Sequence, residues 1–250
     1  MDSELITLKR KPCTILCGAL VEKTDWEKLI DNLTRQGTLR TPKIIKALQT
    51  LPRTRFLPID SQAYSANDTP LPIGYGQTIS APHMVAIMNE ALQLQTGQKI
   101  LEVGAGSGWH AATIAEIIAP KEAPRSEWGH VYTIEINQNL ADTARKNIMN
   151  TGYGDRVTII VGDGSKGYLE KAPYDRIFVA AAAPEIPKPL MEQLKSGGIM
   201  LIPVGSTSLF QALIKVTKDI DGKLKEENLG GVAFVPLTGE YGFKFQRVKC

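Results

Sequence analysis

Three glycines at alternate positions form the stretch of this sequence best suited to binding a ligand. Gly104, Gly106 and Gly108 belong to Leu-Glu-Val-Gly-Ala-Gly-Ser-Gly, which follows an apolar run and precedes a helix-forming run. Glycine lets the chain turn tightly and lets a ligand lie against bare backbone, while a helix amino terminus attracts negative charge. Such turns bind nicotinamide dinucleotides, flavins or S-adenosylmethionine, and a purely structural turn is a further alternative.

Acidic residues near this turn favour S-adenosylmethionine. The glycine spacing lacks the third glycine that clamps a diphosphate, and Glu102 stands two residues before Gly104. A carboxylate there could hold the ammonium of a methionine moiety, whereas it would repel a diphosphate. Glu135 ends the next expected strand, where an acid accepts hydrogen bonds from ribose hydroxyls. Asp163-Gly164 follows the third strand and is expected beside adenine, with a simple Asp-Gly turn as the alternative.

The elements that must position these residues alternate between strand and helix. The apolar pattern predicts strands at 99–103, 130–136, 157–161, 174–180 and 199–204, and helices at 81–93, 109–119, 138–150 and 187–195. This alternation predicts a parallel sheet covered on both faces. Residues 209–218 and 231–235 are expected to form antiparallel strands, and 53–77 a long loop. A Pro-containing insert at 120–129 lengthens the interval between the glycine turn and Glu135.

The chain is expected to form one domain with a short extension. Residues 1–23 are predicted to be a flexible extension and 24–250 a single methyltransferase domain. Within it, 24–80 would form a helical and loop cap, 81–205 the cofactor-binding core, and 206–250 a C-terminal hairpin. The cap begins with a capping box, Thr24 with Glu27, and a second helix begins at Thr41-Pro42.

Composition narrows the classes of partner. The 250 residues carry a net charge of +3 and are 43% hydrophobic, which favours a soluble protein without nucleic acid or membrane as a partner. No apolar run approaches the ~18 residues that span a bilayer. Cys13, Cys17 and Cys250 show neither metal-ligand spacing nor a disulfide framework. We therefore expect no metal, a cytoplasmic location and a monomer.

A longer pattern resembles one particular family. The stretch Asp68-Thr-Pro-Leu-Pro-Ile-Gly-Tyr-Gly-Gln-Thr-Ile-Ser-Ala-Pro-His-Met84 is similar to the signature of protein-L-isoaspartate O-methyltransferases. The similarity continues through the glycine turn, Gly162-Asp-Gly164, Ala172-Pro-Tyr-Asp175 and Gly231-Val-Ala-Phe-Val-Pro-Leu-Thr238, and covers about residues 24 to 243. The glycine turn is common to many methyltransferases, whereas Gly-Gln-Thr-Ile-Ser-Ala-Pro-His is far more specific to this family.

The resemblance implies both a fold and an activity. The fold would be the class I S-adenosylmethionine-dependent methyltransferase fold, an α/β, Rossmann-like, doubly wound and mostly parallel sheet, with added N-terminal helices and a C-terminal antiparallel hairpin. The activity would be protein repair: methylation of the α-carboxylate of L-isoaspartyl residues in damaged proteins and peptides. The ester then closes to a succinimide without the enzyme, and partial hydrolysis restores aspartate.

The resemblance also assigns roles to residues. Ser80 matches the active-site position and would donate its hydroxyl to the substrate carboxylate; spacing alone favours a helix N-cap there. Thr78, Ile79 and His83 are expected beside the cofactor. Val235 and Thr238 are expected against the substrate, with an ordinary buried strand as the alternative. His110 and His130 show no partner pattern and are expected to be structural or surface residues.

Three other functions stay open at this point. A methyltransferase acting on RNA or a small molecule would share the glycine turn, although no base-stacking surface is visible in the sequence. An oxidoreductase with a dinucleotide cofactor is disfavoured by Glu102 and by the missing glycine. A binding module that kept the fold without activity is disfavoured by the presence of every motif residue.

Overall fold

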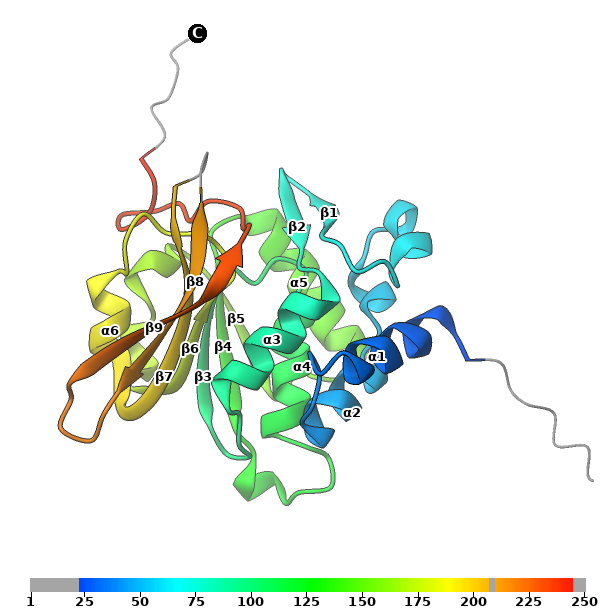
Figure 1. Cartoon of the computed structure of the whole chain (residues 1–250), viewed down its shortest axis with the longest axis horizontal. Helices are drawn as coiled ribbons and strands as arrows, with labels where there is room; N and C mark the ends of the chain where they lie inside the picture. Colours follow the sequence, from blue (N-terminus) through cyan, green and yellow to red (C-terminus); the bar gives the residue numbers. More distant parts are fainter. Residues whose placement is uncertain (1–22, 207–209, 245–250) are drawn as a thin grey trace, which may run out of the picture.

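A single twisted sheet, with helices on both faces, organises the molecule (Figure 1). The computed structural model describes residues 23–206 and 210–244. Residues 1–22 of the predicted extension and the three cysteines therefore lie outside the described residues. The first five strands of the sheet, in spatial order, are β5 (Val157–Val161), β4 (His130–Glu135), β3 (Lys99–Val103), β6 (Tyr174–Val179) and β7 (Leu194–Gly205), and all are parallel. This confirms the predicted parallel core.

The strand order reverses at the glycine turn. From β3, the chain adds β4 and β5 on one side and then β6 and β7 on the other. The carboxyl ends of β3 and β6 therefore border a crevice, which is where ligands bind in open α/β sheets. The glycine turn leaves β3 at this point and leads into α4 (Trp109–Ile118).

Both faces of the sheet are apolar, because its central strands are buried on both sides. Ile100, Val131 and Phe178 pack toward one face, beneath α3 (Pro82–Leu92), α4 and α5 (Gln138–Thr151). The neighbouring residues Leu101 and Ile177 point to the other face and pack with α6 (Lys188–Gln193). Figure 1 shows α6 on one side of the sheet and α3 and α4 on the other.

Two amino-terminal helices form an outer layer over α4. They are α1 (Asp25–Arg35) and α2 (Pro42–Thr50). The predicted capping box is present, because the Thr24 hydroxyl accepts from Glu27 N and the Glu27 carboxylate accepts from Thr24 N at 2.7 Å. Trp26 and Trp109 meet edge to face, with ring centroids 5.9 Å apart. This contact joins the outer layer to the helix that follows the glycine turn.

The segment predicted as a loop at 53–77 contains regular secondary structure, so that prediction is only partly right. It contains two 3₁₀ helices, Arg53–Phe56 and Ile59–Tyr64, and a two-stranded hairpin of β1 (Leu71–Gly74) and β2 (Gln77–Ile79). Tyr75 adopts a φ of 55° in the turn between two glycines that also have positive φ. Strands of three or four residues are too short for a clear period in the sequence.

The carboxyl-terminal strands differ from the prediction at one end. β8 (Gln211–Lys218) pairs antiparallel with β7, and β9 (Leu224–Val232) pairs antiparallel with β8 as the exposed edge strand. The predicted strand at 231–235 is therefore displaced. Charged residues 225–227, which masked the strand in the sequence, suit an exposed edge because they discourage pairing with other chains. Beyond the end of β9, the Gln211 side chain takes the place of a strand partner by donating to Phe234 O and accepting from Phe234 N.

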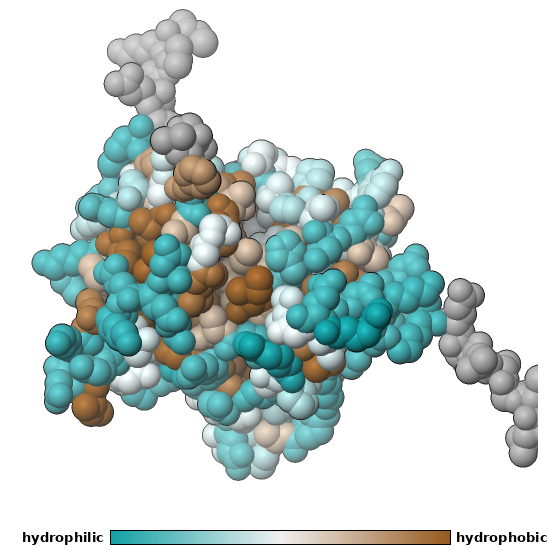
Figure 2. Space-filling view, in the orientation of Figure 1, coloured by the Kyte–Doolittle hydropathy of each residue, from teal (hydrophilic) through white to brown (hydrophobic). Residues whose placement is uncertain are grey.

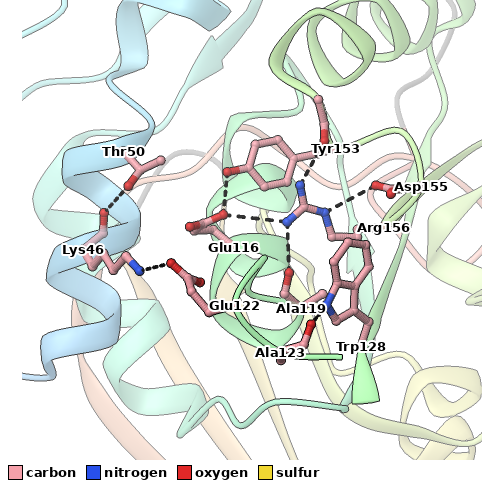
Figure 3. A network of polar contacts seen from close by, with 11 residues as sticks. Lys46, Thr50, Glu116, Ala119, Glu122, Ala123, Trp128, Tyr153, Asp155 and Arg156 are labelled. Carbon is pink, nitrogen blue, oxygen red and sulfur yellow. Dashed lines mark hydrogen bonds and ion pairs between the residues drawn. The ribbon is translucent and has the colours of Figure 1, made fainter. Parts of the chain in front are cut away.

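The predicted insert at 120–129 is closed by a buried cation (Figure 3). The Arg156 guanidinium lies between the rings of Trp128 and Tyr153, at 5.0 and 4.1 Å from their centroids. Its Nη atoms donate to Ala119 O and Gly152 O, and it lies 3.7 Å from the Glu116 carboxylate. Tyr153 and Glu116 are also hydrogen-bonded. This cluster fixes the loop between α4 and β4 far from the glycine turn.

None of the helices in the described part of the chain has the length and apolar character needed to cross a bilayer.

Candidate active site

The glycine turn is held against the sheet by its own backbone. Gly104 and Gly106 adopt φ angles of 95° and 52°, in the left-handed region that favours glycine. Gly104 N and Ala105 N both donate to Ile134 O of β4, at 2.8 and 3.2 Å. A Cβ on Gly106 would lie 3.3 Å from the Ile73 side chain of the β1–β2 hairpin. The turn therefore forms a narrow floor beneath that hairpin.

Glu135 supports the turn from the end of β4. Its carboxylate accepts from Gly106 N at 2.9 Å and from Asn137 N at 3.0 Å, and the residue is 6% exposed. Asn137 is the N-cap of α5, so this one side chain joins the glycine turn to the start of the next helix. Each carboxylate oxygen has a second lone pair, so Glu135 can still accept hydrogen bonds from a ligand.

Glu102 is a buried carboxylic acid at the same edge of the sheet. It is 1% exposed, and neither of its carboxylate oxygens has a hydrogen-bond partner among residues 23–206 and 210–244. Burial raises the pKa of Glu102 to about 8; the nearby Thr133 side chain opposes this rise in part, and the Glu135 carboxylate adds to it. A cation held against Glu102 would reverse this effect by stabilising the charged form.

These residues surround a cavity of about 340 Å³ at the carboxyl ends of β3, β4 and β6. It brings together most of the site residues predicted from the sequence. The predicted residues that line it are Thr78, Ile79, Ser80, Glu102, Gly104, Gly106, Glu135, Gly164, Val235 and Thr238. Segments far apart in the chain therefore meet at one place.

Three predicted ligand contacts do not line this cavity. Gly108 is the N-cap of α4, and a Cβ there would lie 3.2 Å from Ile148 of α5, so this glycine permits helix packing. Asp163 accepts hydrogen bonds from Ser165 N and Glu240 N and so ties down the carboxyl-terminal segment. The His83 ring is hydrogen-bonded to Asp68 and faces a neighbouring cavity.

That second cavity, of about 470 Å³, continues from the first. Thr78, Ser80, Ala180 and Val235 line both. The remaining wall of the second cavity is largely apolar and includes Met84, Phe210, Val232 and Phe234. Figure 2 shows apolar side chains gathered around β8 on this face of the molecule. An acidic polar cavity thus opens into an apolar one, with Ser80 at the boundary.

Ser80 is not the N-cap that spacing alone favoured. Ala81 holds the N-cap position of α3 and makes no side-chain capping bond, while Pro82 begins the helix. Asp68 does the capping from a distance, because its Oδ1 accepts from His83 N at 2.8 Å. Ser80 is half-buried, and its hydroxyl does not cap the start of α3.

The cavity also includes residues that the sequence did not single out. His110 lies in its wall, 7% exposed, with Nε2 2.9 Å from Asn89 Oδ1 and its ring 4.4 Å from that of Phe178. Burial lowers the pKa of His110 to about 3, so its imidazole is neutral at physiological pH. Ile136, an apolar residue that is 51% exposed, lies in the same wall. Its position there follows from its place directly after Glu135 in the chain. His130 lies elsewhere, on β4, and bonds to Thr158.

The raised pKa of Glu102 predicts a stability that depends on pH. Unfolded, this carboxyl titrates near its ordinary value of about 4.3, whereas in the folded protein it titrates at about 8. Between these values the folded state binds more protons, so its stability falls as the pH rises, by up to about 1.4 kcal/mol per pH unit. Glu102→Gln removes the titrating group. We expect this variant, unfolded by denaturant without ligand, to gain stability over the wild type as the pH increases from about 4.5 to 8.

Glu116→Gln is the matched control, because Glu116 is also a buried acid but already has Tyr153 and Arg156 as partners. A stability difference between Glu102→Gln and the wild type that stays constant with pH would contradict the assignment.

Comparison with known proteins identifies one family. The model of the Protein-L-isoaspartate(D-aspartate) O-methyltransferase (PCMT) family matches residues 24–242. A Protein-L-isoaspartate O-methyltransferase of Hyperthermus butylicus is 55% identical over 217 residues, which cover 87% of this chain and 90% of that protein. Protein-L-isoaspartate O-methyltransferase 2 of Archaeoglobus fulgidus is 52% identical over 221 residues, which cover 88% and 96% of the two chains.

Solved structures agree with these sequence matches. A Plasmodium falciparum structure with the same family name, in complex with S-adenosyl-L-homocysteine, superposes with a TM-score of 0.76 at 26% identity and covers 86% of this chain and 99% of its own. A second protein-L-isoaspartate O-methyltransferase superposes with a TM-score of 0.75 at 29% identity, covering 86% and 67% of the two chains. The matched region agrees with the one that the sequence pattern delimited.

Proposed function

This chain belongs to the protein-L-isoaspartate(D-aspartate) O-methyltransferase family, and on that premise we propose how its residues carry out the reaction. The protein transfers a methyl group from S-adenosylmethionine to the α-carboxylate of L-isoaspartyl residues in damaged proteins and peptides. The products are a methyl ester and S-adenosylhomocysteine. The observation that carries the proposal is the position of Ser80, where the acidic cavity meets the apolar one.

The acidic cavity suits the methyl donor. Glu102 is a buried carboxylate that lacks a hydrogen-bond partner among the described residues, which fits the ammonium of a methionine moiety. Glu135, with lone pairs to spare, fits ribose hydroxyls. Gly104 and Gly106 leave bare backbone between these two acids. When bound, S-adenosylmethionine supplies a methyl group on a positively charged sulfur.

The apolar cavity suits the methyl acceptor. The substrate carboxylate has a pKa near ~4 and is already ionised at neutral pH, so no residue has to remove a proton. The protein must instead align the carboxylate and keep water away while charge is lost between the two reactants. We assign the first task to the Ser80 hydroxyl with the backbone of Thr78 and Ile79, and the second to the β1–β2 hairpin and to Val235 and Thr238.

Gly108, Asp163 and His83 then have supporting roles. Gly108 allows α4 and α5 to approach, and Asp163 anchors the segment that follows Thr238. His83 belongs to the acceptor side, since it lines the apolar cavity. This changes its expected role from cofactor contact to substrate-side residue.

A matched pair of peptides tests the function. The peptides are identical except for isoaspartate or aspartate at one position, and each is offered with labelled S-adenosylmethionine. We expect a base-labile labelled ester in the isoaspartyl peptide only, because only that isomer presents an α-carboxylate on a side branch of the chain. Equal labelling of both peptides would contradict the substrate assignment, and labelling of neither would contradict the activity.

We also propose a cytoplasmic monomer that does not bind nucleic acid. The small net charge of +3 supports the last point, and the spacing of the three cysteines supports a reducing compartment. Sedimentation at the mass of a dimer would contradict the monomer.

A further inference from the structure

Arg53 is a fully buried cation whose donors are all in use. It is 0% exposed, and its five N–H groups face five backbone carbonyl oxygens. Nε donates to Ser65 at 3.2 Å, Nη1 to Thr69 at 2.7 Å and Ser80 at 3.1 Å, and Nη2 to Asn67 at 2.7 Å and Tyr64 at 3.5 Å. One side chain therefore ties the 64–69 segment to the backbone of Ser80.

The carbonyls that Arg53 binds lie on either side of Asp68. Asn67 and Thr69 flank Asp68, whose Oδ1 accepts from His83 N at 2.8 Å and lies 2.9 Å from His83 Nδ1. Asp68 therefore holds the first turn of α3, directly after Ser80. Fixing the backbone on both sides of Asp68 fixes the helix start as well.

Arg53 also lies close to a residue in the wall of the acidic cavity. Its guanidinium carbon lies 6.0 Å from the ring centroid of Trp109, and Trp109 lines that cavity. The Trp109 indole N–H in turn donates to Leu51 O, two residues before Arg53. The donor side and the acceptor side of the site thus share one buried anchor.

We propose that Arg53 is a positioning residue for methyl transfer, which sets the place of Ser80 and of the 64–69 segment relative to the acidic cavity. The inference rests on the proposed function, since it concerns the alignment of the substrate carboxylate at Ser80. Arg53 touches no reacting atom. Its effect passes through the Ser80 backbone and through Asp68.

A planar guanidinium is needed for this task. Its donors are fixed in one plane and can bind carbonyls from several directions, whereas a lysine ammonium has three donors on one atom. Lysine at position 53 keeps the charge but cannot hold five acceptors. Burial lowers the pKa of Arg53 to about 10, so it stays charged at neutral pH.

The test compares two buried arginines in the full chain. For Arg53→Lys we expect kcat for the isoaspartyl peptide to fall about 10- to 100-fold, because small misplacements of reacting groups cost rate. The Kd for S-adenosylmethionine should stay within about threefold, since Glu102 and Glu135 are untouched. Arg156→Lys is the matched control: Arg156 is 1% exposed and also binds backbone carbonyls, but it belongs to the cluster around Glu116 (Figure 3). It should lose thermal stability and keep kcat within about threefold.

The outcomes separate the inference from the proposed function. A wild type without isoaspartyl methylation contradicts the function itself. An active wild type with an equally active Arg53→Lys variant overturns the role of Arg53. A parallel loss of kcat and of cofactor affinity in Arg53→Lys, or an equal loss of kcat in Arg156→Lys, also overturns it, because either result describes general damage.

A second variant decides the matter if Arg53→Lys does not fold. Asp68→Ala changes a partly exposed side chain and cuts the same connection where it reaches α3. We expect a lower kcat with an unchanged Kd for S-adenosylmethionine. An unchanged kcat in Asp68→Ala would show that the connection from Arg53 to the start of α3 does not position Ser80.

Discussion

Replacing Glu135 with alanine is expected to weaken binding of S-adenosylmethionine about 100-fold. Two hydrogen bonds from ribose to a buried carboxylate, each contributing about 1.5 kcal/mol, together correspond to about two orders of magnitude in Kd. The loss also leaves Gly106 N and Asn137 N without their acceptor, so the glycine turn and the start of α5 both loosen. Titration calorimetry with S-adenosylmethionine, alongside a measurement of unfolding, distinguishes weak binding from loss of fold.

Two further variants make the result specific. Glu135→Gln keeps one carbonyl acceptor and should weaken binding about tenfold. Glu116→Gln changes a buried glutamate of similar exposure that faces Tyr153 instead of the cavity, and it should bind S-adenosylmethionine like the wild type. If Glu135→Ala binds within about threefold of the wild type, the ribose site lies elsewhere.

The core of the fold could be predicted because its strands are buried on both faces. Residues 99–103 and 157–161 were predicted with the bounds that the structure shows. Such strands appear in the sequence as short, nearly continuous apolar runs between polar segments, and the helices between them keep a clear period. The glycine turn and Glu135 follow from the same logic, because the carboxyl ends of parallel strands meet at one edge.

The elements at the edges could not be predicted in the same way. β9 carries three consecutive charged residues, 225–227, and two glycines along an exposed edge strand, so no apolar alternation marks it. The β1–β2 hairpin has strands of four and three residues and a turn in which Tyr75 has a positive φ. The segments on either side of the hairpin are held by contacts between residues far apart in the sequence, such as the hydrogen bonds from Arg53 to Thr69 O and Ser80 O.

The residues of the site likewise include some that the sequence predicts and some that only the structure reveals. Ser80 matched the pattern of an N-cap. Only the structure shows that the start of α3 is capped by Asp68, which accepts from His83 N and lies fifteen positions before His83 in the chain. His110 lines the cavity because α4 packs beside β6, and no partner pattern in the sequence marks it. The motif glycines also have different roles: Gly106 lines the cavity, whereas Gly108 allows two helices to approach each other. A motif therefore indicates the site without assigning each of its residues to the ligand.

Ser80→Ala is expected to lower kcat for the isoaspartyl peptide about 10- to 100-fold, with little change in the Kd for S-adenosylmethionine. Ser80 lies on the boundary shared by both cavities, and its hydroxyl is not used to cap α3. Its expected contribution is to orient the carboxylate, and loss of alignment reduces the rate far more than it reduces binding of a cofactor held by Glu102 and Glu135. Steady-state kinetics with the peptide varied at saturating S-adenosylmethionine, together with calorimetry for the cofactor, measures both quantities.

Ser61→Ala supplies the control for that experiment. Ser61 is a buried serine beneath the same hairpin, and its hydroxyl donates to Pro72 O over a long 3.5 Å. Removing it should leave kcat unchanged, so a drop in Ser80→Ala alone reports the position of the hydroxyl and not a disturbance of the hairpin. If Ser80→Ala loses cofactor affinity as strongly as kcat, Ser80 belongs to the donor side of the cleft. If it keeps full activity, the backbone of Thr78 and Ile79 aligns the carboxylate without it.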